Sequence, residues 1–317
     1  MRAGLIVNPR SGGARGKGLA LARMLESNPQ ITVRVIDEFG RLPALLDDFA
    51  RDGVTDLFIS SGDGTIHAIQ TELAERKPFA VLPRLSLMPH GSTNMTAADL
   101  GFRNHSIEVQ ADFIRNLNVA ETRQRPTLRA ANPRDGRPRH GMFLGTGAVS
   151  EATLYCQQAF NARGVRGSWA TFATLASTVS RAVFTKADAN DTTRPDRPYR
   201  MTVTADGKPL ADGDQLLLMA TTLQRLILNA RPFWGGHTAP IRTTLLPYPP
   251  PSIARWILPI MYGSETRRVT ESVKSFASST LEVATSNSFV MDGEFFDGPE
   301  NEPLRIETGP SFTFVRG

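Results

Sequence analysis

The 317-residue sequence predicts an α/β domain with a parallel, doubly wound sheet, followed by a second half that is mainly β. Short apolar runs alternate with stretches of helical spacing up to about residue 117, which is the rhythm of βαβ units. From about residue 122 the sequence changes to turn-forming residues and strand-like runs. The length favours two domains over one, and 40% hydrophobic residues are enough to fill two cores.

The first half is expected to alternate strands and helices. Leu42, Leu45, Leu46 and Phe49 fall on one face of a helix, and Gly53 after them provides a C-terminal stop. In chain order, we expect strands at 4–8, 31–37, 57–60 and 79–82, and helices around 17–26, 42–52, after Gly64, near 96–100 and at 107–117.

The second half is expected to consist of strands with two helical inserts, near 151–162 and 168–184. Residues 199–220 predict two strands around an Asp-Gly turn. Closing strands are expected at 280–285, 288–293, 303–308 and 311–317.

Composition and charge narrow the class of protein. The single cysteine, Cys156, excludes an intramolecular disulfide framework, and the first residues show no secretory pattern, so a cytoplasmic location is expected. No apolar stretch approaches the roughly 20 residues that cross a bilayer. A net charge of +5 and a pI near 9.7 favour acidic partners. The arginines are scattered without interleaved aromatic residues, so no nucleic-acid partner is expected.

Three loops rich in small residues follow predicted strands: NPRSGG at 8–13, SGDGT at 61–65 and PHGSTN at 89–94. Ligands of open α/β sheets bind beyond the carboxyl ends of the strands, so three such loops together predict an anion site. Each loop also has a plain structural explanation, as a turn or as a helix cap at Asp63 or Asn94.

Familiar nucleotide and metal motifs are absent. Residues 12–18 fall short of a P-loop, no G-x-G-x-x-G follows a strand, and the five histidines lack metal-ligand spacing. Near the C-terminus, MDGEFFDGPE places four carboxylates close together. A hairpin turn explains them, and so does a Mg²⁺-binding or proton-accepting role beside a phosphate. The four are Asp292, Glu294, Asp297 and Glu300.

In this order and at these distances, IVNPRSGG, SGDGTIHA, PHGSTN and a late DGE resemble the diacylglycerol kinase catalytic family, which includes sphingosine and ceramide kinases. NAD kinases share the GDGT part. The resemblance covers nearly the whole chain. It implies a Rossmann-like α/β nucleotide-binding domain at 1–122 and a β-sandwich lipid-binding domain at 123–317, whose last segment returns to the first domain.

The resemblance also implies roles for individual residues, with ATP as the phosphate donor. Asp63 would orient or deprotonate the lipid hydroxyl, and Glu294 is the second candidate for the base. Asp292 and Glu294 would lie near the γ-phosphate and Mg²⁺. The implied nucleotide contacts are Asn8, Ser11 and Gly12 in the first loop, Gly62, Gly64 and Thr65 in the second, and Gly91, Ser92, Thr93 and Asn94 in the third.

Details of the motifs favour sphingoid lipids. SGDGTIH and GSTN are similar to sphingosine kinases, whereas bacterial diacylglycerol kinases usually carry an Asp where Met95 stands. Glu151 resembles an acidic residue that contacts the polar head of the lipid. Arg163 and Arg166 resemble arginines that hold ATP phosphates, although solvated helix charges explain them equally well. The segment 239–250 lacks the Asp-Gly that many bacterial members carry for a structural magnesium.

The resemblance therefore implies an ATP- and Mg²⁺-dependent kinase that phosphorylates a primary hydroxyl of ceramide or another sphingoid lipid, or otherwise of diacylglycerol. Such a kinase would attach peripherally to the inner face of the membrane. Residues 168–185 or 255–263 would serve as the attachment, although core packing also explains both. Two alternatives stay open: a non-catalytic lipid- or nucleotide-binding regulator, and a kinase of the NAD kinase type with a soluble acceptor. The sequence does not indicate the oligomeric state.

Overall fold

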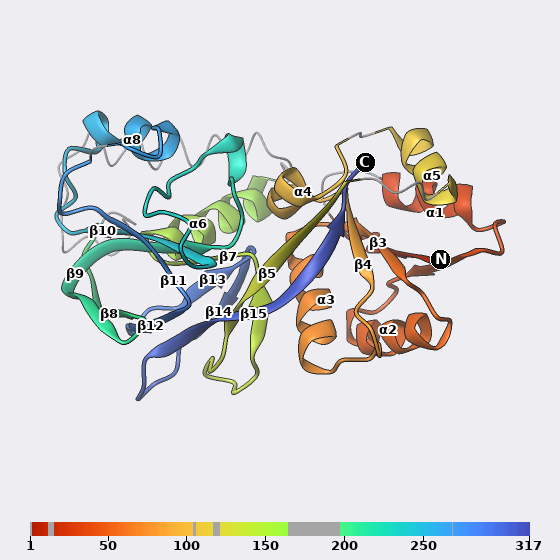
Figure 1. The fold of residues 1–317 in the computed structure, drawn as a ribbon, viewed down its shortest axis with the longest axis horizontal. Helices are drawn as coiled ribbons and strands as arrows, with labels where there is room; N and C mark the ends of the chain where they lie inside the picture. The colour runs from red at the N-terminus through yellow and green to blue at the C-terminus, as the bar shows by residue number, and fades with distance from the viewer. Residues whose placement is uncertain (1, 12–15, 104–105, 117–120, 164–196, 268) are drawn as a thin grey trace. The chain divides into compact units, whose positions relative to one another are not determined.

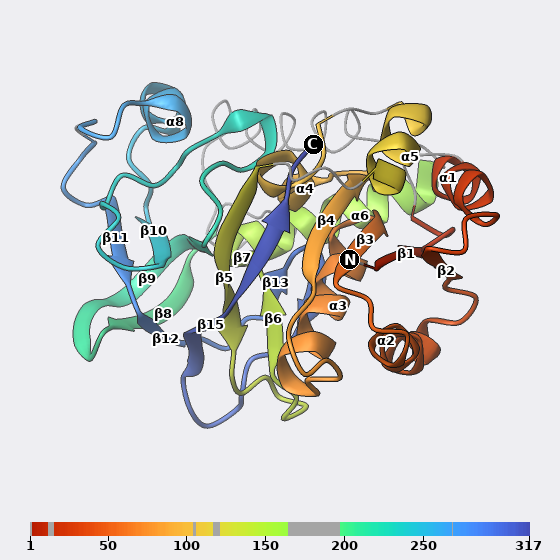
Figure 2. The ribbon, with the colours of Figure 1, turned by 45° about the vertical axis from the view of Figure 1, so that its right-hand side comes forward.

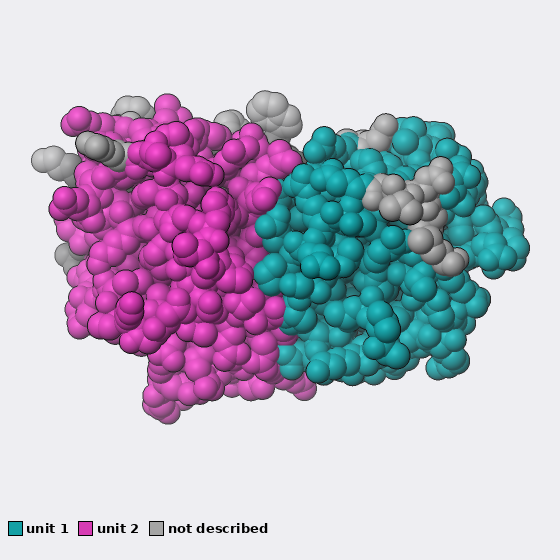
Figure 3. Space-filling view, viewed as in Figure 1, with its two compact units in different colours: residues 1–126, 166–168, 310–317 teal, residues 127–165, 169–309 magenta. Residues whose placement is uncertain are grey.

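The computed structural model describes residues 2–11, 16–103, 106–116, 121–163, 197–267 and 269–317 (Figure 1). They form two compact units, which Figure 3 colours separately. The first unit holds the described residues of 1–126 together with 310–317, and the second holds those of 127–165 and 169–309. Two strands have residues in both units: β5 (Thr122–Ala130) and β15 (Leu304–Val315).

The sheet of the first unit is parallel, and its central strands are buried on both faces. Its strands lie in the order β2 (Ile31–Val35), β1 (Ala3–Val7), β3 (Asp56–Ser61) and β4 (Arg84–Pro89). The end of β15 continues the sheet beyond β4, where Phe314 pairs with Leu85. Every residue of β1 and β3 is buried, which is why these strands read as apolar runs rather than as alternating patterns.

Helices cover both faces of this sheet, as the predicted doubly wound arrangement requires (Figures 1 and 2). On one face, Leu21 of α1 and Ile114 of α5 share a core cluster with Leu5 of the sheet. On the other, Phe49 of α2 lies so close to Gly4 that a Cβ there would be 2.8 Å from its ring. The helices are α1 (Lys17–Leu25), the 3₁₀ turn η1 (Phe39–Arg41), α2 (Leu42–Arg51), α3 (Asp63–Glu75), α4 (Met95–Leu100) and α5 (Ile107–Asn116).

One strand of this sheet begins later than the sequence predicts. The expected strand at 79–82 is a connection, and β4 starts at Arg84 instead. Pro78 and Pro83 enclose the predicted run, and Val81 within it is 83% exposed. Proline cannot donate a hydrogen bond to a neighbouring strand, so this short apolar run does not form a central strand.

The second unit is rich in antiparallel strands. The long strand β9 (Lys208–Thr221) pairs with β8 (Tyr199–Ala205) through its first half, and with β7 (Phe143–Gly147) and β10 (Ile241–Pro247) through its second half. Side chains of β8, β9, β7 and β10 fill one core. The other strands are β6 (Arg139–Gly141), β11 (Lys274–Ser278), β12 (Thr280–Ala284), β13 (Phe289–Met291) and β14 (Glu294–Phe296).

Two helices and one 3₁₀ turn belong to the second unit among the described residues. Helix α6 (Ala148–Arg163) lies where the first helical insert is expected, and the second insert, at 168–184, lies outside the described residues. The 3₁₀ turn η2 (Ile227–Asn229) and helix α8 (Ile253–Tyr262) are not among the predicted elements. In the part of the chain that the structure describes, no helix is both long and apolar enough to cross a membrane.

Candidate functional site

Three loops of the first unit are neighbours because they follow adjacent parallel strands. Strands β1, β3 and β4 lie side by side, and parallel strands end at the same edge of a sheet. The loops after them begin at Asn8, Gly62 and His90. This edge therefore gathers the predicted nucleotide residues of all three loops, except Gly12, which lies outside the described residues.

Hydrogen bonds join the first loop to the second. The Asn8 amide Nδ2 donates to Oγ1 of Thr65 at 2.8 Å, and the backbone N–H of Asn8 donates to the carbonyl of Ser60 at 3.1 Å. The Ser11 hydroxyl accepts a bond from the backbone N–H of Gly62 at 3.2 Å. Asn8 and Ser11 thus hold the first loop against the turn that opens α3.

The second and third loops touch backbone to backbone. A Cβ on Gly91 would lie 2.3 Å from the Cα of Gly62, which real side chains do not tolerate. Within the third loop, Asn94 Oδ1 accepts from the N–H of Gly91 at 2.7 Å, and its Nδ2 donates to the Gly91 carbonyl at 2.8 Å. Asn94 itself has φ 52°, a left-handed conformation that asparagine adopts more readily than most residues. These contacts make Gly62, Gly91 and Asn94 one packed unit.

Asp63 ties the second loop to the helix that follows the third. Its Oδ2 accepts from the N–H of Met95 and its Oδ1 from the N–H of Thr96, each at 3.0 Å. Asp63 therefore caps α4, rather than the helix α3 that it begins. Burial raises the pKa of the Asp63 carboxyl, although the N–H groups of Thr96 and Met95 oppose that shift.

The N-terminus of α3 faces this edge without a side-chain cap. Gly62, the residue before the helix, is extended, and no side chain of the described residues caps the helix there. The first N–H groups of a 13-residue helix and its dipole favour an anion at that position. Beside it, Gly64 and Ser92 are half-buried and Thr93 is exposed. The arrangement suits phosphate oxygens.

One buried pair at this edge was not predicted from the sequence. His90 lies at the start of the third loop, and its Nδ1 is 2.8 Å from Oγ of Ser60, with both residues buried. The sequence feature that could have indicated this pair is the histidine directly before the GSTN run. The pair braces the ends of β3 and β4, which position the loops.

The predicted C-terminal carboxylates differ in their surroundings within the second unit. Asp292 is buried, and its two oxygens accept from the N–H groups of Met142 at 2.9 Å and Phe143 at 3.0 Å. Glu294, at the start of β14, is exposed. Asp292 has φ 48° in a tight turn, so the hairpin predicted by Asp-Gly is present. Of the two side chains, that of Glu294 is the more open to a ligand.

Glu151 lies in the first turn of α6 and forms an ion pair. Its Oε1 is 3.3 Å from Nη2 of Arg197. The guanidinium carbon of Arg197 also lies 5.2 Å from the centre of the Tyr199 ring, within the reach of a cation–π contact. The side chain of Arg163 and all of Arg166 lie outside what the structure describes, so their expected phosphate contacts stay predictions.

The fit to Mg²⁺ depends on the nucleotide rather than on the chain alone. No group of three or more His, Cys, Asp or Glu side chains within the described ranges is placed to hold a metal ion. Mg²⁺ is usually bound by one or two carboxylates together with substrate phosphates. A site of that kind needs one or two carboxylates beside the bound nucleotide.

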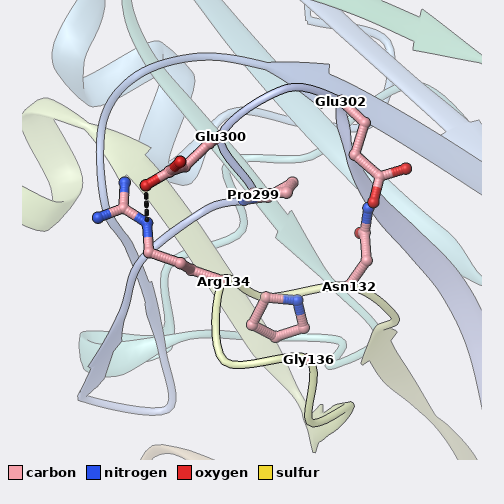
Figure 4. A pocket seen from close by; sticks show the side chains of 7 residues that line it. Asn132, Arg134, Gly136, Pro299, Glu300 and Glu302 are labelled. Atoms are coloured by element: carbon pink, nitrogen blue, oxygen red, sulfur yellow. Dashed lines mark ion pairs between the residues drawn. The ribbon is translucent and has the colours of Figure 1, made fainter.

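A separate surface groove of about 500 Å³ lies in the second unit between two loops (Figure 4). Arg134 on one side is 3.6 Å from Glu300 and 3.5 Å from Asp297 on the other. Asn132, which also lines the groove, donates from Nδ2 to the Pro303 carbonyl at 3.1 Å. These charges are exposed and paired with one another, so the groove does not present a candidate site.

The chain is similar to known proteins in sequence and in fold. Residues 2–123 match the family model for the diacylglycerol kinase catalytic domain. Over 97 residues the chain is 33% identical to "Probable lipid kinase YegS" of Salmonella arizonae and of Salmonella heidelberg, covering 31% of this chain and 32% of each relative. The match thus spans about a third of these curated relatives. A crystal structure of a diacylglycerol kinase from Bacillus anthracis shares the fold, with a TM-score of 0.65 and 18% identity over 100% of this chain and 97% of that one.

Proposed function

We propose that the protein is an ATP-dependent lipid kinase of the diacylglycerol kinase catalytic domain family, because the model of that family matches residues 2–123. It transfers the γ-phosphate to a primary hydroxyl of a membrane lipid. The observation that carries the proposal is the set of three loops joined at one sheet edge, beside the uncapped N-terminus of α3. Backbone N–H groups and a helix dipole at such an edge bind phosphate.

The residues of the loops would act mainly by alignment, because phosphoryl transfer needs positioning and stabilisation of spread negative charge. Asn8, Ser11 and Asn94 hold the loops in register. Asp63 is the first candidate to accept the proton of the lipid hydroxyl, because each carboxylate oxygen has a second acceptor position beyond its bond to the backbone. Glu294 is the second candidate.

Mg²⁺ is part of the proposal as the ion that neutralises the phosphates when the nucleotide is bound. Its proposed carboxylates are Asp292 and Glu294. Asp292 already accepts two backbone bonds and so would act mainly by shaping the turn, while Glu294 offers an exposed carboxylate.

The proposed acceptor is ceramide or another sphingoid lipid, with diacylglycerol second, presented at the inner face of the membrane. Support comes from the SGDGTIH and GSTN sequences and from Glu151, which resembles the acidic residue that contacts the polar head of the lipid. In the structure Arg197 pairs with Glu151, so a headgroup amine or hydroxyl would compete with this guanidinium.

The test is phosphate transfer from γ-labelled ATP to ceramide, sphingosine, diacylglycerol or NAD, each supplied separately. We expect label in the extracted ceramide fraction, and label in diacylglycerol would still support a lipid kinase. Asp63→Asn serves as the loss-of-function control. Label in NAD would favour the soluble-acceptor alternative. No transfer to any acceptor, with ATP or lipid still bound, would favour the non-catalytic regulator.

A further inference from the structure

Helix α8 and the turn η2 expose large apolar side chains on the second unit. Leu258 of α8 is 66% exposed and Tyr262 is 52% exposed. They are four residues apart, with Arg255 three residues before Leu258, so the three side chains lie on one face of the helix. Leu228 of η2 is also 52% exposed. Exposed apolar side chains that lie together, rather than singly, mark interaction surfaces.

The two segments are held together and are firmly placed. The backbone N–H of Arg231 donates to the carbonyl of Met261 at 2.7 Å, so the chain after η2 lies against the C-terminal end of α8. Arg267 donates from Nη1 to the carbonyls of Pro259, at 3.1 Å, and Ile260. These bonds satisfy the last carbonyls of α8 and fix its orientation.

Leu228 is exposed at an additional conformational cost. Its φ of 56° lies in the left-handed region, where a leucine is disfavoured by contact between Cβ and the backbone. A leucine that is both strained and turned to solvent contributes little to folding. The conformation is better explained by a partner that the side chain meets.

The charge around these side chains indicates the chemistry of that partner. Between 222 and 267 the sequence has five arginines and a single carboxylate, Glu265. Arg231 and Arg255 are exposed, and Arg255 also stacks over the Trp256 ring at 5.1 Å. Exposed apolar side chains accompanied by exposed arginines complement the anionic surface of a bilayer. A symmetric contact with a second copy would instead bring the arginines of both copies together.

We propose that α8 and η2 form a membrane-docking surface, which inserts Leu228, Leu258 and Tyr262 at the headgroup boundary of an anionic bilayer while Arg231 and Arg255 contact lipid phosphates. The proposal rests on the proposed lipid kinase function, since it names the surface through which such an enzyme reaches its substrate. It uses only residues of the second unit.

The test is co-sedimentation of the full chain with vesicles of phosphatidylcholine alone, or of phosphatidylcholine with phosphatidylglycerol. We expect tighter binding to the anionic vesicles, and a loss of about tenfold in partition coefficient for Leu258→Glu, the order expected for one exposed leucine. Arg255→Ala should weaken binding to anionic vesicles only. The matched control is Val81→Glu, which changes an 83% exposed residue of the first unit and should bind as the wild type does.

Equal partition of the wild type and Leu258→Glu would overturn the proposal, as would an equal loss in Val81→Glu. Self-association without vesicles that Leu258→Glu abolishes would also overturn it, by making the surface an interface between copies. Labelled phosphate transfer to a short-chain, water-soluble lipid separates the membrane-docking hypothesis from the lipid kinase hypothesis. Wild-type transfer by Leu258→Glu supports docking as a distinct step, whereas vesicle binding without any transfer by the wild type contradicts the kinase function alone.

Discussion

The Cα of Gly62 and the position of a Cβ on Gly91 are only 2.3 Å apart, so the loops after β3 and β4 pack without room for a methyl group. The same Cβ would lie 2.9 Å from Oδ1 of Asn94. Glycine at 91 is therefore required by contact between two loops. Its part in approaching a phosphate comes in addition to that contact.

Gly91→Ala should push the two loops apart. We expect a loss of about 1–3 kcal/mol in the free energy of unfolding, the usual cost of overpacking, and a marked loss of phosphate transfer. Urea denaturation and the labelled-ATP assay measure the two effects. Gly40→Ala is the matched control, because a Cβ at Gly40 meets nothing within 4 Å. Equal stability of the two variants would contradict the close packing of the loops.

Asn94 should be sensitive to both its side chain and its backbone conformation. Asn94→Gly removes the two bonds to Gly91 but tolerates φ 52°, whereas Asn94→Ala removes the bonds and strains the backbone. We therefore expect the alanine variant to be less stable than the glycine variant by roughly 1–2 kcal/mol, measured by urea denaturation. An alanine variant as stable as the glycine variant would argue against the left-handed conformation.

The bond from Asn8 to Thr65 should appear as a coupling between two loops 57 residues apart in the chain. A double-mutant cycle with Asn8→Ala and Thr65→Val should give a coupling of about 0.5–1.5 kcal/mol in the free energy of unfolding. Additive effects would show that the bond does not stabilise the fold. The same cycle on KM for ATP reports whether the bond also supports nucleotide binding.

Local patterns explain how much of the fold could be predicted. The alternation of apolar strands and amphipathic helices before residue 117 depends only on neighbouring residues, so the sequence predicts the doubly wound sheet. Strand β10 was missed because Arg242, Thr243 and Thr244 are polar, yet all three are buried in the structure. Their burial depends on pairing with β9 and β11, which a local pattern does not reveal.

The site shows the same limit. The three glycine loops could be located because each one follows a strand. The partners of Asp63 could not, because Met95 and Thr96 are 32 and 33 residues away in the chain. Only the adjacency of β3 and β4 brings them together. A cap supplied by a neighbouring loop leaves no signature at the helix that it caps.

Burial of Asp63 gives stability a defined dependence on pH. Its pKa is raised above the ordinary 3.8, so between that value and the folded-state value the folded chain keeps a proton that the unfolded chain has lost. The contribution of Asp63 to the free energy of unfolding therefore falls as pH rises through this window. Asn at this position does not titrate, so the stability of the wild type relative to Asp63→Asn should fall over the same range. Urea denaturation of both proteins from acid to neutral pH measures the difference, and a rising difference would contradict the raised pKa.

The raised pKa also suits Asp63 as a general base, and activity should report it. A base must be deprotonated, so kcat/KM should fall as pH is lowered through a value above 3.8. Asp63→Asn should remove this acid limb and lower turnover by roughly 10²–10⁴-fold. Asp206→Asn is the matched control, because the Asp206 side chain also accepts from two backbone N–H groups, those of Ser279 and Thr280, but in the second unit.

The Asp63→Asn variant, with Asp206→Asn as its control, shows whether Asp63 positions α4 or accepts the proton of the lipid hydroxyl. If Asp63 only holds α4 in place, Asp63→Asn should lose turnover in proportion to its loss of stability and should keep the acid limb of the wild type. If Asp63 accepts the proton, turnover falls far more than stability does, and the limb disappears. Because both oxygens of Asp63 are already bonded to N–H groups of Met95 and Thr96, we expect some loss of stability in either case, about 1–3 kcal/mol. The pH profile of the remaining activity therefore decides the role.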